Sequence, residues 1–208
     1  MTAQLVGGLL GAGLARGTPI LIAAIGEVCA ERAGVLNLGV EGMMLMGAVS
    51  GYGVALETGS AWLGLVAAAA VGLLMGLLHA LLVVTLRADQ VVSGLALTFI
   101  GSGFSSVIGA PLVEHRQSVA QLPMIHLHAL RGVPILGPLF FEQSIAVYLG
   151  FALLLICALV LHKTHTGLHL RAVGQNPGAA DAMGVDVARL RYGSVAAGGA
   201  LSGIAGAS

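Results

Sequence analysis

The sequence predicts an all-α protein: a polytopic bundle of transmembrane helices with a broken or re-entrant helix near the N-terminus and a further helix on the cytoplasmic face. Composition supports this class first, since 57% of the 208 residues are hydrophobic and 9% are charged, against about 25% charged in soluble domains. The mean hydropathy is +0.98. Long apolar runs recur without the alternating pattern of barrel strands. A soluble fold would not bury this much apolar surface.

Six apolar segments are each close to the roughly 20 residues that a membrane-spanning helix needs. The last one ends inside an apolar run, where a helix would leave its final carbonyl groups unsatisfied in lipid. We therefore expect residues 1–208 to be a single transmembrane domain that is truncated at its C-terminus. In chain order the segments are Leu5–Ile25, Gly39–Leu56 (which contains Glu41), Ala61–Leu86, Val91–Val113, Ser144–Leu161 and Tyr192–Ser208.

Glycine is abundant, with 32 residues, and aromatic residues make up 4%. Small residues let membrane helices approach closely, so glycines four apart predict helix contacts. The pairs are Gly7 and Gly11, Gly13 and Gly17, Gly47 and Gly51, Gly72 and Gly76, and Gly199 and Gly203.

Two polar regions separate the spans, at residues 111–143 and 163–191. Residues 111–143 hold four of the six prolines and two Lys or Arg residues, whereas residues 163–191 hold four Lys or Arg residues. Because cytoplasmic loops carry the excess of Lys and Arg, we expect residues 163–191 to be cytoplasmic and residues 111–143 to form an external loop. Counting spans back from these loops places the N-terminus outside.

Residues 31–42 combine charge and glycine where the hydropathy indicates membrane. Asn37 and Glu41 are four apart and would share a face if both were helical. An unpaired charge at mid-membrane costs about 2.5–3.5 kcal/mol, so Glu41 needs a partner, a proton or water. Two interpretations stay open: a discontinuous helix that lines a permeation route, or a structural role in which Glu41 pairs with Arg32 or caps a helix. Glu27 is expected near an aqueous boundary.

A short helix is predicted within the cytoplasmic region. Asn176 and Pro177 fit the cap and first position of a helix, and Gly184 suits its C-terminal stop. The three alanines at 179, 180 and 182 are expected on its surface, where small side chains allow a partner protein to dock closely.

Four stretches resemble the permease subunits of ABC importers, and more closely the branch for nucleosides and simple sugars that works with basic-membrane-protein-type binding lipoproteins. ERAGVLNLGVEGMMLMGA is similar to that branch's signature, and RAVGQNPGAADAMGV resembles its cytoplasmic coupling loop. TPILIAAIGEVCAERAG and VVSGLALTFIG also fit. Branched-chain amino-acid and ribose permeases show looser variants, and members of the branch are usually longer than this chain.

The resemblance implies a multi-pass protein of the inner (plasma) membrane. Its partners would be a cytoplasmic ATP-binding-cassette ATPase, a second permease subunit and an extracytoplasmic substrate-binding lipoprotein. The implied cargo is a nucleoside or a simple sugar, with nucleoside favoured by the motif. The implied route residues are Asn37, Glu41, Gly42, Met43 and Met44, and the implied ATPase contacts are Arg171, Gly174, Asn176, Pro177, Ala179, Ala180 and Gly184.

Other functions stay open or are disfavoured. The alternatives are a branched-chain amino-acid-type permease and a stand-alone secondary transporter or channel, which would not need the cytoplasmic helix. No enzyme activity or cofactor is predicted, because the only lysine, Lys163, follows His162 and so belongs to no P-loop. The zero net charge disfavours nucleic acid. Cys29 and Cys157 are expected as small core residues, and no metal site is predicted, including at His126 and His128.

Overall fold

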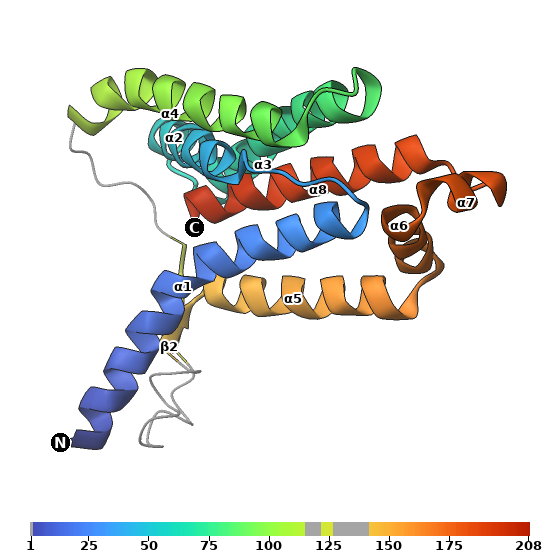
Figure 1. Ribbon diagram of the computed structural model, residues 1–208. Helices are drawn as coiled ribbons and strands as arrows, with labels where there is room; N and C mark the ends of the chain where they lie inside the picture. The colour runs from blue at the N-terminus through green and yellow to red at the C-terminus, as the bar shows by residue number, and fades with distance from the viewer. Residues whose placement is uncertain (1, 115–121, 127–141) are drawn as a thin grey trace.

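The computed structural model describes residues 2–114, 122–126 and 142–208, almost all of them helical (Figure 1). A π-helix, η1, directly continues α3, so the two form one rod. The elements in chain order are α1 (Thr2–Arg32), α2 (Val40–Thr58), α3 (Ala61–Ala80), η1 (Leu81–Thr85), α4 (Gln90–Glu114), β1 (Met124–His126), β2 (Glu142–Ser144), α5 (Ile145–Lys163), α6 (His165–Gln175), α7 (Pro177–Ala182) and α8 (Val187–Ala207).

Four helical stretches in the described part of the chain are long and apolar enough to cross a membrane. The other two predicted spans, α2 and α8, lie inside the bundle, where α8 packs on α1, α2 and α3, and α2 packs on α3, α4 and α8. Much of their surface is covered by other helices, so they need fewer apolar side chains. The predicted all-α, polytopic membrane bundle is confirmed. The four stretches are Val6–Arg32, Ala61–Thr85, Gln90–Leu112 and Ile145–Lys163.

Glycines bring the central helices into backbone contact. A Cβ on Gly72 would collide with the carbonyl oxygen of Gly199, and one on Gly47 would collide with that of Gly203. The contacts predicted at 47/51, 72/76 and 199/203 are therefore confirmed, and Gly7 and Gly11 occupy buried positions. The contact predicted for Gly13 and Gly17 is not seen among the described residues, since none of them lies within 4 Å of a Cβ built at either glycine. The first part of α1 projects beyond the other helices (Figure 1).

The described parts of the two predicted polar regions, the end of α4 with β1 and β2 on one side and the α6–α7 pair on the other, lie at opposite ends of the bundle (Figure 1). α4 continues through Pro111 to Glu114, so the predicted external loop starts later than expected. A proline in a membrane helix is tolerated where neighbouring groups satisfy the freed carbonyl. Residues 115–121 and 127–141 of that loop, including His128, lie outside the described residues.

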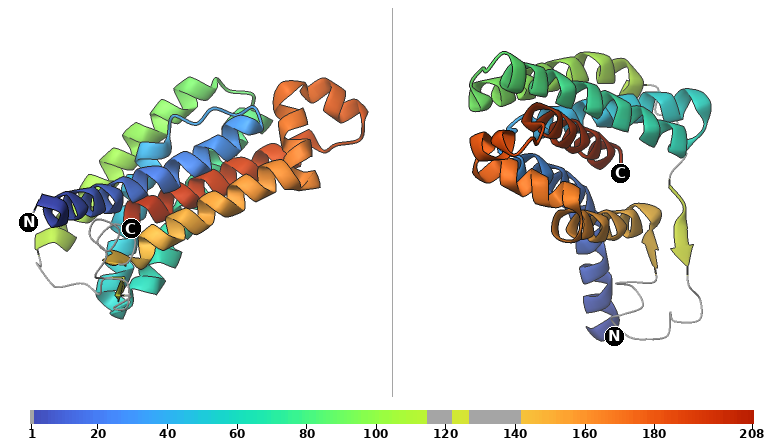
Figure 2. Two further views of the ribbon diagram at one scale, coloured as in Figure 1. Left: turned by 90° about the horizontal axis from the view of Figure 1, so that it is seen from below. Right: turned by 90° about the vertical axis from the view of Figure 1, so that its right-hand side faces the viewer.

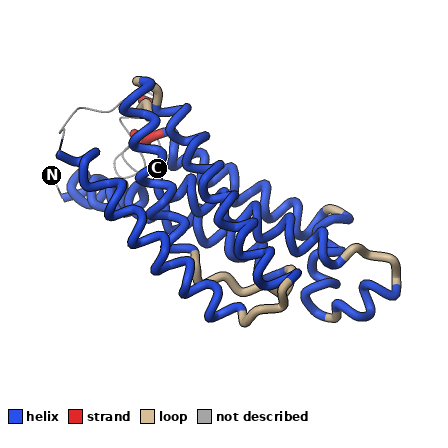
Figure 3. The backbone as a smooth tube through the Cα atoms, turned by 90° about the horizontal axis from the view of Figure 1, so that it is seen from above, coloured by secondary structure: helices blue, strands red, loops and turns tan. Residues whose placement is uncertain are grey.

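No strands are predicted from the sequence, yet two short ones are present. β1 and β2 pair antiparallel with Met124 opposite Ser144, at the end of the bundle that holds both termini (Figure 3). Extended backbone needs hydrogen-bond partners, and at this end of the bundle the two segments supply them to each other. Three residues per strand were too few to produce a recognisable pattern.

The predicted cytoplasmic region is a pair of helices, α6 and α7, followed directly by α8. α8 starts at Val187, before the predicted Tyr192, because the side chain of Asp186 caps it by accepting a 2.9 Å hydrogen bond from the N–H of Arg189. α6 and α7 project together from one end of the bundle (Figure 2). The two helices together form the surface of the protein at that end of the bundle (Figure 2).

Candidate functional site

The helical backbone is interrupted between Arg32 and Val40. α1 includes Glu31 and Arg32, so the break begins later than the sequence predicts. Gly34, with φ of +80°, stops α1, and its N–H donates to the carbonyl of Glu31 at 2.9 Å while the N–H of Val35 donates to Ala30 at 3.1 Å. This is the pattern of a glycine C-cap. Residues 35–39 then run back along the bundle as non-helical backbone.

Side chains from two neighbouring helices accept the N–H groups of this extended segment. Gln90 Oε1 accepts from the N–H of Leu36 at 2.7 Å, and Glu27 Oε1 accepts from the N–H of Asn37 at 2.8 Å. Lipid offers no hydrogen bonds, so non-helical backbone at membrane depth persists only when protein or water satisfies it. Here α1 and the start of α4 provide the acceptors.

The carbonyl groups of the segment are satisfied in the same way. The ring of His79, which is 0% exposed, contacts the carbonyl of Leu36 through Nε2 at 3.1 Å and Ser93 Oγ through Nδ1 at 3.0 Å. Thr98 Oγ1 donates to the carbonyl of Leu38 at 2.8 Å. α3 and α4 therefore hold the segment from its other side.

Asn37 and Glu41 do not share a helix face, contrary to the prediction. Asn37 lies in the extended segment, where its Oδ1 accepts from the N–H of Gly39 at 2.9 Å and turns the chain before α2 begins. The Asn37 side chain is 3% exposed and its Nδ2 contacts Met43 Sδ at 3.6 Å. Glu41 is exposed in the first turn of α2, where the helix dipole favours a carboxylate.

The two structural roles considered for Glu41 are not seen. Within the described residues Glu41 has no ion pair with Arg32. The N-cap position of α2 belongs to Gly39, so no side chain caps this helix. Glu41 is therefore a carboxylate without an ion-pair partner in the described part of the chain, on a surface next to the extended segment.

The remaining predicted route residues are packed inside the protein. A Cβ on Gly42 would collide with the carbonyl oxygen of Leu97, so Gly42 allows α2 and α4 to touch. Met43 is 0% exposed, and Met44 is half-buried against the cluster around Ile22. These residues fix the position of α2, while Glu41 is the one that faces outward.

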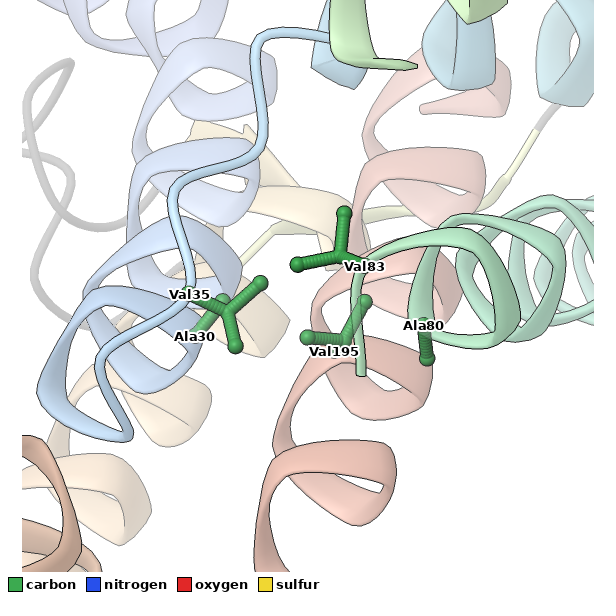
Figure 4. Packing of buried hydrophobic residues seen from close by; sticks show 5 residues of the cluster. All are labelled: Ala30, Val35, Ala80, Val83 and Val195. Carbon is green, nitrogen blue, oxygen red and sulfur yellow. The ribbon is translucent and has the colours of Figure 1, made fainter. Parts of the chain in front are cut away.

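The extended segment is also anchored by an apolar contact. Val35 packs with Ala30, Ala80, Val83 and Val195, so that α1, the rod of α3 and η1, and α8 converge on it (Figure 4). Val35 is 1% exposed. The segment thus has a buried side chain at its start and a hydrogen-bonded backbone along its length.

Sequence reasoning missed most of the residues that hold this segment. It assigned Glu27 only a place near an aqueous boundary and gave His79, Gln90 and Thr98 no role. Glu27 and His79 carried a usable signal, because an ionisable residue inside an apolar span is a functional-site hypothesis by default. Gln90 and Thr98 carried none, since polar uncharged residues are common at helix ends and in glycine-rich helices.

The caps predicted for the short helix α7 are confirmed. Asn176 Oδ1 accepts from the N–H of Ala179 at 3.0 Å, Pro177 occupies the first turn of α7, and Gly184 has φ of +82° just beyond its end. The N–H of Val185 returns to the carbonyl of Ala180 at 3.0 Å. Short polar and glycine signals therefore determined both ends of α7.

The expectation that all three alanines lie on the surface of α7 is wrong for Ala180, which is 5% exposed. A helix of six residues still needs one packed face, and α7 contacts both α6 and α8. Ala179 is exposed, and the neighbouring Met183 is 84% exposed. Arg171 folds back on its own helix, where its Nε donates to the carbonyl of Gly167 at 3.3 Å.

Comparison with known proteins gives the chain its relatives. A putative glucose ABC transporter permease protein of Haloferax volcanii is 39% identical over 96% of this chain and 61% of its own length. A guanosine ABC transporter permease protein of Bacillus subtilis is 35% identical over 98% of this chain and 67% of its own. A nucleoside ABC transporter permease protein of Lactococcus lactis is 35% identical over 91% and 63%, respectively.

The chain thus spans between 61% and 67% of the length of these relatives. No solved structure matches it. A family model described as the permease component of branched-chain amino acid transport systems matches residues 9–208. The match includes the extended segment, the helices that hold it, and the α6–α7 pair. The chain therefore belongs to the family of branched-chain amino acid transport system permease components.

Proposed function

We propose that this chain is the membrane-spanning permease subunit of an ABC importer in the plasma membrane, and that it moves a small polar solute using a partner ATPase. The observation that carries the proposal is the family match over residues 9–208. The side chains of Glu27, His79, Gln90 and Thr98, which hydrogen-bond the backbone of residues 35–39 and are called the polar clamp below, support it. Backbone kept non-helical inside a membrane bundle is typical of transport routes.

The route is proposed to run past the start of α2, with Glu41 facing it. Glu41 is exposed and has no ion-pair partner among the described residues, whereas Asn37, Gly42 and Met43 are buried and hold the segment in place. A second permease subunit would cover the exposed face of α2 that carries Glu41 and so complete the route. Replacing Glu41 should therefore reduce uptake without disturbing the fold.

The test uses the complete transporter in membrane vesicles. Glu41→Gln should lower solute uptake while membrane insertion and ATPase association stay at the wild-type level. Glu57→Gln is the matched control, because Glu57 is an exposed carboxylate at the other end of the same helix. Equal uptake by the two variants would remove Glu41 from the route.

α7 is proposed to dock on the ATPase. It projects from the bundle together with α6 (Figure 2), and its exposed residues include Ala179 and Met183. Asn176, Pro177 and Gly184 shape the helix, and Ala180 seats it on α6 and α8. Arg171 and Gly174 lie on α6 behind it and would act through its position.

Met183→Asp is the sharpest probe of this docking, because the side chain is 84% exposed and its replacement leaves the core intact. We expect affinity-purified permease to lose its ATPase partner, identified by mass spectrometry through its P-loop. Glu57→Lys, a charge change at the opposite end of the bundle, should retain it. ATPase association that survives Met183→Asp would remove α7 from the docking site, whereas a wild-type protein that transports without an ATPase would favour a stand-alone transporter.

The proposed cargo is a nucleoside, with a simple sugar as the second candidate. Two of the relatives are named for guanosine or nucleoside transport and one for glucose transport. Uptake of labelled guanosine, with unlabelled glucose and leucine as competitors, separates the classes. Guanosine uptake that glucose does not inhibit supports the nucleoside assignment, whereas competition by glucose supports the sugar. Competition by leucine points to a branched-chain amino-acid permease.

A further inference from the structure

We propose that Gly34, Gly174 and Arg191 form a junction that transmits movement of α6–α7 to the extended segment at residues 35–39. The inference rests on the proposed function, since it assumes that α7 receives the force of an ATPase. It adds the specific contact by which that force reaches the route. The three residues come from the end of α1, the end of α6 and the first turns of α8.

The end of α6 lies directly on the turn that stops α1. A Cβ on Gly174 would collide with the carbonyl oxygen of Arg32 and would lie 3.3 Å from the N atom of Gly34. A Cβ on Gly34 would in turn lie 3.3 Å from the Cα of Gly174. The two glycines therefore place backbone against backbone, with no flexible side chain between them to absorb a displacement.

Arg191 fixes the same turn from α8. Its Nε donates to the carbonyl of Ala33 at 3.2 Å, and its Nη2 lies 3.3 Å from a Cβ built on Gly34. Ala33 is 0% exposed. The turn is thus held between the guanidinium on one side and the end of α6 on another, and it has little freedom to move independently of them.

α6 is packed tightly enough against its neighbours to move as a rigid unit. Val173 is 0% exposed and Leu170 is 8% exposed, and Leu170 joins Ala33 and Leu161 in one apolar cluster. At its other end, a Cβ on Gly167 would collide with the carbonyl oxygen of Val160 on α5. Packed interiors shift as units rather than deform continuously, so a displacement of α7 reaches the α1 turn.

Beyond the Gly34 turn, the chain continues directly into residues 35–39, which border the proposed transport route. Val35 follows Gly34 directly and is buried against Val83 and Val195 (Figure 4), and Leu36 and Asn37 are held by Gln90 and Glu27. No free loop separates the junction from this clamp. Movement of the turn must therefore either displace the clamped segment or break its hydrogen bonds.

The test measures how much uptake each hydrolysed ATP supports, in vesicles that contain the complete transporter. For Gly174→Ala, measured on the complexes that retain the ATPase, we expect uptake per hydrolysed ATP to fall about fivefold or more, within the range of typical coupling free energies. Gly193→Ala is the matched control, because it adds the same methyl group to α8 where nothing lies within 4 Å. It should leave uptake per ATP unchanged.

Arg191→Lys provides a second variant that keeps the charge and most of the packing but loses the Nε donor. We expect the same partial uncoupling, with a normal size-exclusion profile. The junction is ruled out if both variants keep wild-type uptake per ATP, or if hydrolysis and uptake fall in proportion along with protein yield. Wild-type protein that neither binds an ATPase nor takes up guanosine would instead overturn the proposed function.

Discussion

The N–H of Asn37 lies 2.8 Å from Oε1 of Glu27, and this hydrogen bond ties the extended segment to α1. The two residues are ten positions apart, with the end of α1 and the Gly34 turn between them. The bond places an acidic side chain within an apolar span where it holds backbone in position. It also explains why Glu27 occurs in that span at all, since an acceptor is needed at that depth.

Glu27→Ala should therefore destabilise the protein. It removes the acceptor and leaves the N–H of Asn37 unsatisfied, which costs about 1–3 kcal/mol of unfolding free energy. Glu27→Gln keeps an oxygen acceptor and should stay close to wild type. Thermal unfolding of the detergent-purified protein measures the difference. If Ala and Gln lower the melting temperature equally, the hydrogen bond is not what holds the segment.

Replacing His79 tests the opposite side of the clamp. His79→Ala removes the contacts with Ser93 and with the carbonyl of Leu36, and leaving that carbonyl unpaired should cost about 1–3 kcal/mol. His165→Ala, at an exposed position on α6, should be nearly neutral. Matching melting temperatures for the two variants would contradict the role given to His79.

Glycine contacts between α3 and α8 should be sensitive to a single methyl group. Gly203→Ala places a Cβ against the carbonyl oxygen of Ala68, and such overpacking costs about 1–3 kcal/mol. Gly193→Ala lies on the same helix with open space around it, and should be neutral or stabilise by up to about 1 kcal/mol. Denaturation in mixed micelles compares the two. Equal stability would mean that α3 and α8 do not pack this closely.

The two cysteines offer a direct check of the packing between α1 and α5. The Sγ atoms of Cys29 and Cys157 lie 3.3 Å apart, and both side chains are half-buried rather than fully inside the core. Copper phenanthroline should join them within one chain, which intact mass and peptide mapping detect. Cys157→Ser should abolish the cross-link. Two thiols that both stay free under oxidant would place the helices further apart.

Labelling tests the proposed orientation. In a background without native cysteines, Glu57→Cys should react with a membrane-impermeant maleimide in intact cells, whereas Gln175→Cys should react only after permeabilisation. Both positions are exposed; Glu57 lies in the last turn of α2 and Gln175 ends α6, and these two helix ends are at opposite ends of the bundle (Figure 1). The reverse pattern would invert the assignment drawn from the positive-inside rule.

The sequence by itself determined the membrane class, most of the span positions and both ends of α7. Hydropathy over 20 residues and the capping preferences of Asn176, Pro177 and Gly184 depend on local chemistry, so they can be read along the chain. The same holds for the glycine pairs at 47/51, 72/76 and 199/203, because glycines four apart predict a close helix contact whichever helix supplies the other side.

Only the tertiary structure decided how residues 33–39 are held. The partners of this backbone come from Glu27, His79, Gln90, Thr98 and Arg191, which are distributed over four helices. Nothing in their spacing indicates a common target, because hydrogen bonds between distant segments depend on how the helices pack. The same reason explains the separation of Asn37 from Glu41 and the burial of Ala180. Which side of a helix is buried depends on the helices that pack against it, and this packing is a property of the whole bundle.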